Sequence, residues 1–273
     1  MTRPLSLAAL TVLELSPVQM VRCAAEAGYD HVGLRLLPAT ADEPTWDCVG
    51  DTPLVRELCA GLDGSGVRVL DIEILRLKPD TRVADFAAVL ETGARLDARC
   101  VLVAGNDPDE TRLCEHLAML ADLARPYALT VCLEPMPWTD VRNFAQALRI
   151  VESAARDNTG VLIDPIHFDR GGSRPAELAG VAPQRLPYLQ FCDAPAERPS
   201  TLEGLLHQAR AERLPPGQGG LDLAALLRAV PRDVPLSLEV PMATLARTMP
   251  ASARARLLRE TTERWLVAQG LAG

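Results

Sequence analysis

Two kinds of segment alternate along the whole chain. Short apolar runs bounded by polar turns are followed by longer segments, rich in Ala, Leu and Arg, whose apolar positions recur with helical period. The short runs are typical of buried strands, and the periodic segments indicate amphipathic helices. A regular alternation of strand and helix favours a parallel sheet with right-handed crossover connections.

The pattern places each expected element within a few residues. The expected strands are Leu5–Leu10, His31–Leu36, Arg68–Leu75, Cys100–Ala104, Thr130–Glu134, Thr159–Asp164, Leu186–Cys192 and Val234–Val240. The expected helices are Pro17–Ala27, Pro53–Gly64, Val83–Leu96, Asp109–Tyr127, Val141–Ala155, Pro175–Gly180, Thr201–Glu212, Leu221–Val230 and Ala251–Gln269. Ser16-Pro17 and Thr52-Pro53 each place a capping residue before a proline, which is typical of a helix start.

The number of strand–helix units predicts the fold. Eight such units in 273 residues indicate one closed (β/α)8 TIM barrel, a fold of about 250 residues. A doubly wound open sheet would normally have glycine in its first strand-to-helix turn, and the stretch from Leu10 to Pro17 has none. We therefore expect a single domain over residues 1–273. The stretch from Ala194 to Gly220 predicts an elaborated loop-helix segment after the seventh strand.

Composition and charge narrow the class of protein. Hydrophobic residues make up 48% of the chain, enough for a large core, and charged residues make up 23%. A net charge of −8 without a Lys/Arg-rich run argues against nucleic-acid binding. No apolar stretch approaches the roughly 20 residues of a membrane span. The apolar start is interrupted by Glu14 and predicts a first strand rather than a signal peptide.

The cysteines indicate a reducing compartment. There are seven, an odd number, and no two have the spacing of a metal knuckle. They are expected to be buried thiols of a cytoplasmic protein. The sequence leaves the oligomeric state open, although homo-oligomers are common.

Charged residues stand where buried strands should be apolar. Arg35, Asp71 and Glu73 interrupt the second and third strands. Glu134 and Glu239 come at the ends of the fifth and eighth.

Side chains alternate between the two faces of a strand. Glu134 therefore shares the barrel interior with Cys132, Asp164 does so with Leu162, and Gln190 lies on the inner face of the seventh strand. These polar groups converge on the carboxyl-terminal mouth, where barrel active sites lie.

One carboxylate at a strand end could simply cap a helix or pair with an arginine. Three, at Glu134, Asp164 and Glu239, indicate a shared site. Clustered carboxylates raise one another's pKa values, and a divalent cation can hold them ionised together. The turns Gly171–Ser173 and Gly217–Gly220 could each cradle a phosphate, but plain turns are favoured over that role.

Four segments and the last strand together resemble the sugar phosphate isomerase/epimerase superfamily, the xylose-isomerase-like barrels. The resemblance covers nearly the whole chain. It is carried by the order and strand-end placement of Leu133-Glu134-Pro135-Met136-Pro137-Trp138, Asp164-Pro165-Ile166-His167, Leu189-Gln190-Phe191-Cys192-Asp193, Arg213-Leu214-Pro215-Pro216-Gly217-Gln218-Gly219 and Ser237-Leu238-Glu239-Val240-Pro241.

The resemblance implies one divalent metal ion. Carried over residue by residue, the ligands are Glu134, Asp164, Gln190 and Glu239. Gln190 departs from the family, which commonly has histidine at that position. A set of oxygen ligands favours Mn²⁺ or Mg²⁺ over Zn²⁺.

The resemblance also implies roles in catalysis and substrate binding. Glu134 and Glu239 would remove and return a proton beside a carbonyl group. His167 and Arg213 would contact substrate oxygens, with Arg198 as the alternative arginine because Ala194–Glu212 looks like an insertion. Trp138, just after Glu134, is expected to form an apolar wall for the substrate.

Three functions remain open at this point. The first is a metal-dependent isomerase or epimerase of a small polyhydroxylated carbonyl compound, acting through an enediolate. The second is a dehydratase of the 2-keto-myo-inositol or 3-dehydroshikimate type, because the first half of that reaction is shared. The third is a catalytically silent binding or scaffold barrel, suggested by Gln190. A DNA-cleaving branch of the family uses three zinc ions, and the four histidines of this chain argue against it.

Overall fold

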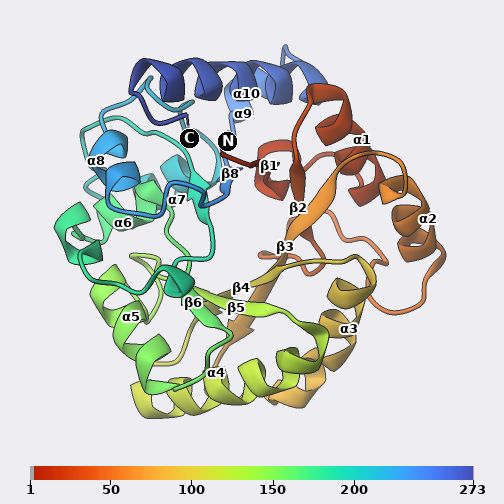
Figure 1. The fold of residues 1–273 in the computed structure, drawn as a ribbon, viewed down its shortest axis with the longest axis vertical. Helices are drawn as coiled ribbons and strands as arrows, with labels where there is room; N and C mark the ends of the chain where they lie inside the picture. Colours follow the sequence, from red (N-terminus) through yellow and green to blue (C-terminus); the bar gives the residue numbers. More distant parts are fainter. Residues whose placement is uncertain (1–2, 273) are drawn as a thin grey trace.

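The computed structural model describes residues 3–272, and eight parallel strands form its centre (Figure 1). They are hydrogen-bonded in the order β6-β5-β4-β3-β2-β1-β8-β7. The open edges meet where Ile163, just beyond β6, forms a parallel bridge to Leu189 of β7. The predicted (β/α)8 barrel is thereby confirmed. The strands are β1 (Leu5–Leu7), β2 (His31–Arg35), β3 (Arg68–Leu77), β4 (Cys100–Gly105), β5 (Thr130–Glu134), β6 (Thr159–Val161), β7 (Leu189–Phe191) and β8 (Leu236–Leu238).

Helices surround the strands in a ring (Figure 1). They are α1 (Pro17–Ala27), α2 (Pro53–Leu62), α3 (Ala87–Arg95), α4 (Glu110–Ala124), α5 (Phe144–Ser153), α6 (Pro165–Arg170), α7 (Leu202–Arg210), α8 (Leu223–Arg228), α9 (Ala243–Ala246) and α10 (Ala251–Ala268). The side chains of Ser16 and Thr52 cap α1 and α2, as their sequence predicts. Helix α7 is the predicted extra helix after the seventh strand.

Several expected elements differ in extent or type. The first strand ends at Leu7 rather than Leu10, because the chain turns into a 3₁₀ helix at Ala9–Val12. An α-helix was expected at Pro175–Gly180, where only a 3₁₀ helix, Pro175–Leu178, is found. The helix that follows β6 is α6, and it begins directly after Asp164. The Asp164 side chain accepts a hydrogen bond from the Ile166 N–H at 3.0 Å, so the expected strand end is a helix cap.

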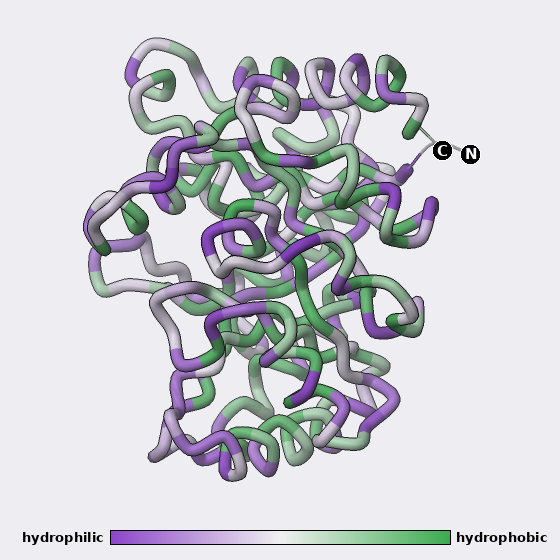
Figure 2. The backbone as a smooth tube through the Cα atoms, turned by 90° about the vertical axis from the view of Figure 1, so that its left-hand side faces the viewer, coloured by the Kyte–Doolittle hydropathy of each residue, from purple (hydrophilic) through white to green (hydrophobic). Residues whose placement is uncertain are grey.

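The hydrophobic core has two layers. A small inner cluster fills the barrel: Leu70, Ile74, Cys100, Leu102, Ala104, Cys132, Met136, Leu162 and Tyr188. A much larger cluster packs the outer faces of the strands against the helices. Cys132 and Leu162 lie inside the barrel, as side-chain alternation predicts for the residues that share a face with Glu134 and Asp164. Several surface helices in Figure 2 change between purple and green along their length, as amphipathic helices do.

The two ends of the chain lie side by side (Figure 1). The Arg3 N–H donates to the carbonyl oxygen of Ala272 at 3.3 Å. The guanidinium of Arg3 also donates to the carbonyl oxygens of Leu271 and Pro231. Within residues 3–272, no helix is long and apolar enough to cross a membrane.

The glycine-rich turn at Gly217–Gly220 wraps around an internal carboxylate. Asp193, two residues beyond β7, accepts hydrogen bonds from the N–H groups of Gly217, Gly219 and Leu221 at 2.9–3.1 Å. A Cβ atom on Gly219 would lie 2.2 Å from the carbonyl oxygen of Ala194, so only glycine fits there. The anion that this turn binds is therefore Asp193 itself. This explains why the segment that ends in Asp193 and the glycine-rich turn occur in the same chain.

Asp193→Ala should lower the free energy of unfolding by about 3 kcal/mol, because it leaves several buried N–H groups without an acceptor. Urea denaturation followed by circular dichroism measures this. Asp80→Ala, in an exposed turn after β3, is the control and should change stability by less than about 0.5 kcal/mol. Equal stability of the two variants would contradict the structural role of Asp193.

Candidate active site

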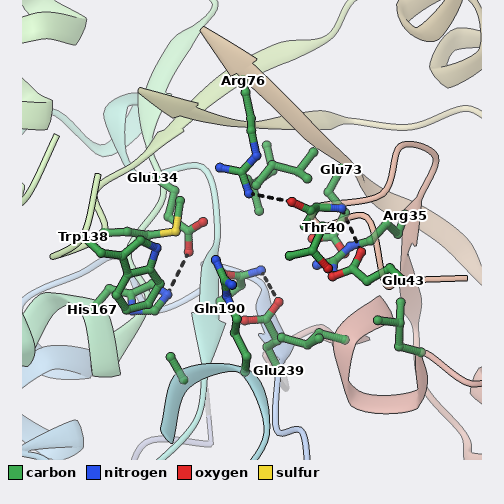
Figure 3. Close-up of a pocket in the computed structure, with 18 of the residues that line it drawn as sticks. Arg35, Thr40, Glu43, Glu73, Arg76, Glu134, Trp138, His167, Gln190 and Glu239 are labelled. Atoms are coloured by element: carbon green, nitrogen blue, oxygen red, sulfur yellow. Dashed lines mark hydrogen bonds and ion pairs between the residues drawn. The ribbon is translucent and has the colours of Figure 1, made fainter. Parts of the chain in front are cut away.

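Four predicted residues meet at the carboxyl-terminal mouth of the barrel. Glu134 ends β5, Gln190 lies within β7 and Glu239 directly follows β8. All three line a pocket of about 340 Å³, and Asp164 lies buried behind its wall. Figure 3 shows Gln190 between the two glutamates. The structure therefore places at one end of the barrel the four side chains that the resemblance assigns to the metal. Of their carboxylates, those of Glu134 and Asp164 have ligand atoms within 4.8 Å of each other.

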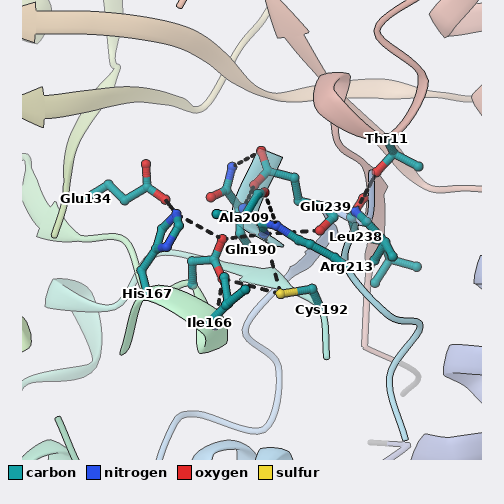
Figure 4. Close-up of polar contacts among 12 residues, drawn as sticks. Thr11, Glu134, Ile166, His167, Gln190, Cys192, Ala209, Arg213, Leu238 and Glu239 are labelled. Carbon is teal, nitrogen blue, oxygen red and sulfur yellow. Dashed lines mark hydrogen bonds and ion pairs between the residues drawn. The ribbon is translucent and has the colours of Figure 1, made fainter. Parts of the chain in front are cut away.

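His167 lies against two of these carboxylates. It projects from α6, and its Nε2 atom is 3.7 Å from both Glu134 Oε1 and Asp164 Oδ2 (Figure 4). Burial lowers the pKa of His167 to about 4, so the imidazole is neutral at pH 7. Ligand atoms of the three side chains lie within 4.8 Å of one another. A neutral imidazole and two carboxylates at this spacing could hold a metal ion.

Arg213 bridges two carboxylates at the base of the site. Its Nη1 atom donates to Asp164 Oδ2 at 2.6 Å, and its Nη2 atom forms an ion pair with Glu239 Oε2 at 2.8 Å. Its Nε–H donates to the carbonyl oxygen of Ala209 at 2.6 Å (Figure 4). The guanidinium lines the pocket but is engaged on every side by the protein. The alternative, Arg198, is exposed and does not line the pocket.

Gln190 has one satisfied and one unsatisfied polar atom. Its Nε2 atom donates to Glu239 Oε1 at 2.8 Å. Its Oε1 atom is buried and has no hydrogen-bond donor among the residues that the structure describes. A buried oxygen without a partner costs about 1–3 kcal/mol. A hard cation is a suitable partner, because amide oxygens ligate Mg²⁺, Ca²⁺ and Mn²⁺.

The carboxylates carry more negative charge than Arg213 balances. Burial, with Glu239 and Asp164 nearby, raises the pKa of Glu134 well above its usual range. Burial also raises the pKa of Glu239 to about 7, although Arg213 opposes the shift. For Asp164 the balance is reversed: burial raises its pKa, but Arg213 and His167 bring it below the usual value. A divalent cation would relieve this repulsion, so the donor set fits such an ion.

The opposite wall of the pocket was not assigned from the sequence. Arg35, at the end of β2, pairs with Glu43 at 2.9 Å and with Glu73 of β3 at 3.1 Å. Arg76, which follows Glu73 near the end of β3, also lines the pocket (Figure 3). The charged residues that interrupt β2 and β3 were the sequence feature that could have identified this wall. Nothing in the sequence indicated that the loop after β2, which includes Glu43, also lines the pocket.

Helix α7 contributes to the pocket. Its residues Ala209 and Arg210 line the pocket together with Trp138. The guanidinium of Arg210 lies 5.8 Å from the centre of the Trp138 ring, a cation–π arrangement. Trp138 also meets His167 edge-on, with ring centres 4.9 Å apart.

Comparison with known proteins identifies the family. The model of the xylose isomerase-like TIM barrel family matches residues 21–265. The chain belongs to this family. A 3-dehydroshikimate dehydratase of Pseudomonas aeruginosa is 31% identical over 202 residues, which are 68% of this chain and 31% of the relative. An inosose isomerase of Bacillus velezensis is 29% identical over 158 residues, 54% of each chain. The matches thus span only about a third to a half of these relatives.

Solved structures of xylose isomerase-like barrels share the fold. The IolI protein with a bound zinc atom superposes with a TM-score of 0.76 at 22% identity, over 98% of both chains. A D-psicose 3-epimerase from Clostridium cellulolyticum gives 0.69 at 14% identity, over 100% of this chain and 99% of the other. A fusion of such a barrel with a 4-hydroxyphenylpyruvate dioxygenase gives 0.77 at 20% identity, over 100% of this chain and 45% of the other.

Arg213→Gln should lower the free energy of unfolding by about 3–5 kcal/mol, because it leaves two buried carboxylates without their shared cation. Chemical denaturation measures the loss. Arg198→Gln serves as the matched control at an exposed position and should leave stability unchanged. An Arg213→Gln variant as stable as the wild type would show that the bridge contributes nothing to folding.

Proposed function

We propose that this chain is a divalent-metal-dependent enzyme that moves a proton beside the carbonyl group of a small polyhydroxylated compound, as an isomerase or epimerase. The observation that carries the proposal is the pair of carboxylates, Glu134 and Glu239, on either side of one pocket (Figure 3). Inosose isomerases of Bacillus are among the relatives. A silent scaffold would have no need to bury such a costly pair.

The metal ion would be held by Glu134, Asp164, Gln190 and Glu239. Three carboxylates and an amide oxygen favour Mn²⁺ or Mg²⁺ over Zn²⁺. When bound, such an ion polarises a carbonyl group and stabilises the negative charge of an enediolate.

Proton transfer is assigned to the two glutamates. One glutamate, as the carboxylate, removes the proton from the carbon beside the carbonyl. The other, as the carboxylic acid, donates a proton to the opposite side of that carbon or to the neighbouring carbon. The neutral imidazole of His167 is placed to hydrogen-bond a substrate oxygen, and Trp138 supplies an apolar wall beside it.

Dehydration is the second candidate, and the comparison with Pseudomonas aeruginosa supports it. That match to a 3-dehydroshikimate dehydratase covers 68% of this chain, more than the 54% covered by the inosose isomerase of Bacillus velezensis. The same carboxylate would remove the first proton. The electron pair of the broken C–H bond would then expel a β-hydroxyl group, which takes a proton from the carboxylic acid of the other glutamate and leaves as water.

Glu134→Gln and Glu239→Gln should each lower turnover by about 10²–10⁴-fold, because each removes a general acid–base group. The assay follows proton exchange by NMR in D₂O with Mn²⁺ present, using inososes, ketohexoses and 3-dehydroshikimate. Rearranged or inverted products identify an isomerase or epimerase, and loss of water identifies a dehydratase. Glu260→Gln, exposed on α10, is the control. Undiminished turnover by both site variants would refute the assignment.

Gln190→His should change the metal preference. Imidazole nitrogen suits Zn²⁺, whereas amide oxygen suits Mn²⁺ and Mg²⁺, so the affinity for Zn²⁺ relative to Mn²⁺ should rise by at least about tenfold. Competition calorimetry with the two ions measures the ratio. An unchanged ratio, with both ions bound, would show that residue 190 is not a ligand.

A further inference from the structure

Four arginines line the pocket, and two of them have no ion pair with any residue that the structure describes. Arg35 is paired with Glu43 and Glu73, and Arg213 is paired with Asp164 and Glu239. The other two are Arg76 and Arg210. Neither forms an ion pair with any residue between positions 3 and 272.

Arg76 is held in the pocket by neutral groups. It is half-buried near the end of β3, and its Nη1 atom donates to Asn106 Oδ1 at 3.1 Å. Its Nη2 atom donates to the carbonyl oxygen of Ala39 at 3.3 Å. These bonds orient the guanidinium toward the pocket, as Figure 3 shows, without neutralising it. Burial and the nearby charge of Arg210 lower the pKa of Arg76, and the carboxylates of Glu134 and Glu43 offset only part of this shift.

Arg210 brings a second guanidinium to the same pocket. It ends α7, and its head lies over the ring of Trp138. The ring restrains the side chain without supplying a carboxylate. The two like-charged groups come from distant parts of the chain, β3 and α7. Two arginines that face one pocket and repel each other are expected to bind an anion between them.

We propose that Arg76 and Arg210 form a binding subsite for an anionic group of the substrate, a carboxylate or a phosphate. The inference rests on the proposed function, because it places this group beside the half of the pocket that handles the carbonyl. Guanidinium groups bind both anions through paired N–H donors. The substrate class is then an acidic or phosphorylated polyhydroxylated carbonyl compound rather than a neutral one. With Glu134 and Glu239 bound to a metal ion, Arg76 and Arg210 would remain available for the anionic group of the substrate.

Direct binding tests the subsite with two matched pairs of unreactive or slowly reacting probes. Shikimate is compared with its uncharged methyl ester, and a ketohexose phosphate with the free ketohexose, by calorimetry on the Mn²⁺-loaded protein. The anionic member of one pair should bind about 10–100-fold more tightly than its neutral counterpart, as charge-assisted hydrogen bonds to two arginines allow. The pair that shows the preference identifies the group as carboxylate or phosphate.

Variants assign the preference to these two side chains. Arg76→Met and Arg210→Met should each weaken binding of the anionic probe by about tenfold or more and leave the neutral probe unchanged. Arg76→Lys should retain part of the preference. Arg68→Met is the matched control, because Arg68 is exposed at the other end of β3. Its binding should equal that of the wild type.

Two results would overturn the subsite: equal binding of both members in both pairs, or equal weakening of acid and ester by Arg76→Met. These outcomes are separable from a failure of the proposed function. Turnover of neutral inososes without any preference for anions would remove the subsite and leave the reaction in place. A preserved preference for anions in a protein that shows no proton exchange would support the subsite and contradict the proposed reaction.

Discussion

The site depends on three carboxylates buried at one end of a barrel around a single guanidinium. Arg213 satisfies Asp164 and part of Glu239, and Gln190 donates to the rest of Glu239. Glu134 receives no hydrogen bond from a described residue, and burial beside the other two raises its pKa. Charge of one sign concentrated in a buried site is costly unless a cation is present. The proposed metal binding and the proposed proton transfer both rest on this imbalance.

The two sides of the pocket present different groups. The strands β5 to β8 supply the carboxylates and Gln190, which suit a metal ion and a substrate carbonyl. The strands β2 and β3 with helix α7 supply arginines, of which only Arg35 is neutralised by acidic partners. A substrate that spans the two halves would place its reactive carbon near the glutamates and its anionic end near Arg76 and Arg210. In this account the arginines select the substrate, and the carboxylates determine the type of reaction.

Sequence alone predicted the strand-end residues well, because a charge that interrupts a buried strand has few structural roles. Side-chain alternation placed Glu134 and Glu239 correctly at the mouth. It could not show that Arg213 bridges Asp164 and Glu239, because that contact depends on how the chain returns after α7. Nor could it show that Arg76 has no ion pair among residues 3–272, because its hydrogen-bond partners Ala39 and Asn106 come from loops remote in sequence. Helix α6 was missed because Asp164-Pro165 was interpreted as the end of a strand.

Titration of the metal-free protein with Mn²⁺ tests the central claim most directly. The comparison is with Glu134→Ala, a change that breaks no hydrogen bond among the described residues and should leave the circular dichroism spectrum unchanged. The account predicts saturable binding of one Mn²⁺ per chain in the wild type and its loss in the variant. Absence of saturable binding of Mn²⁺ and of Mg²⁺ by the wild-type protein would contradict it.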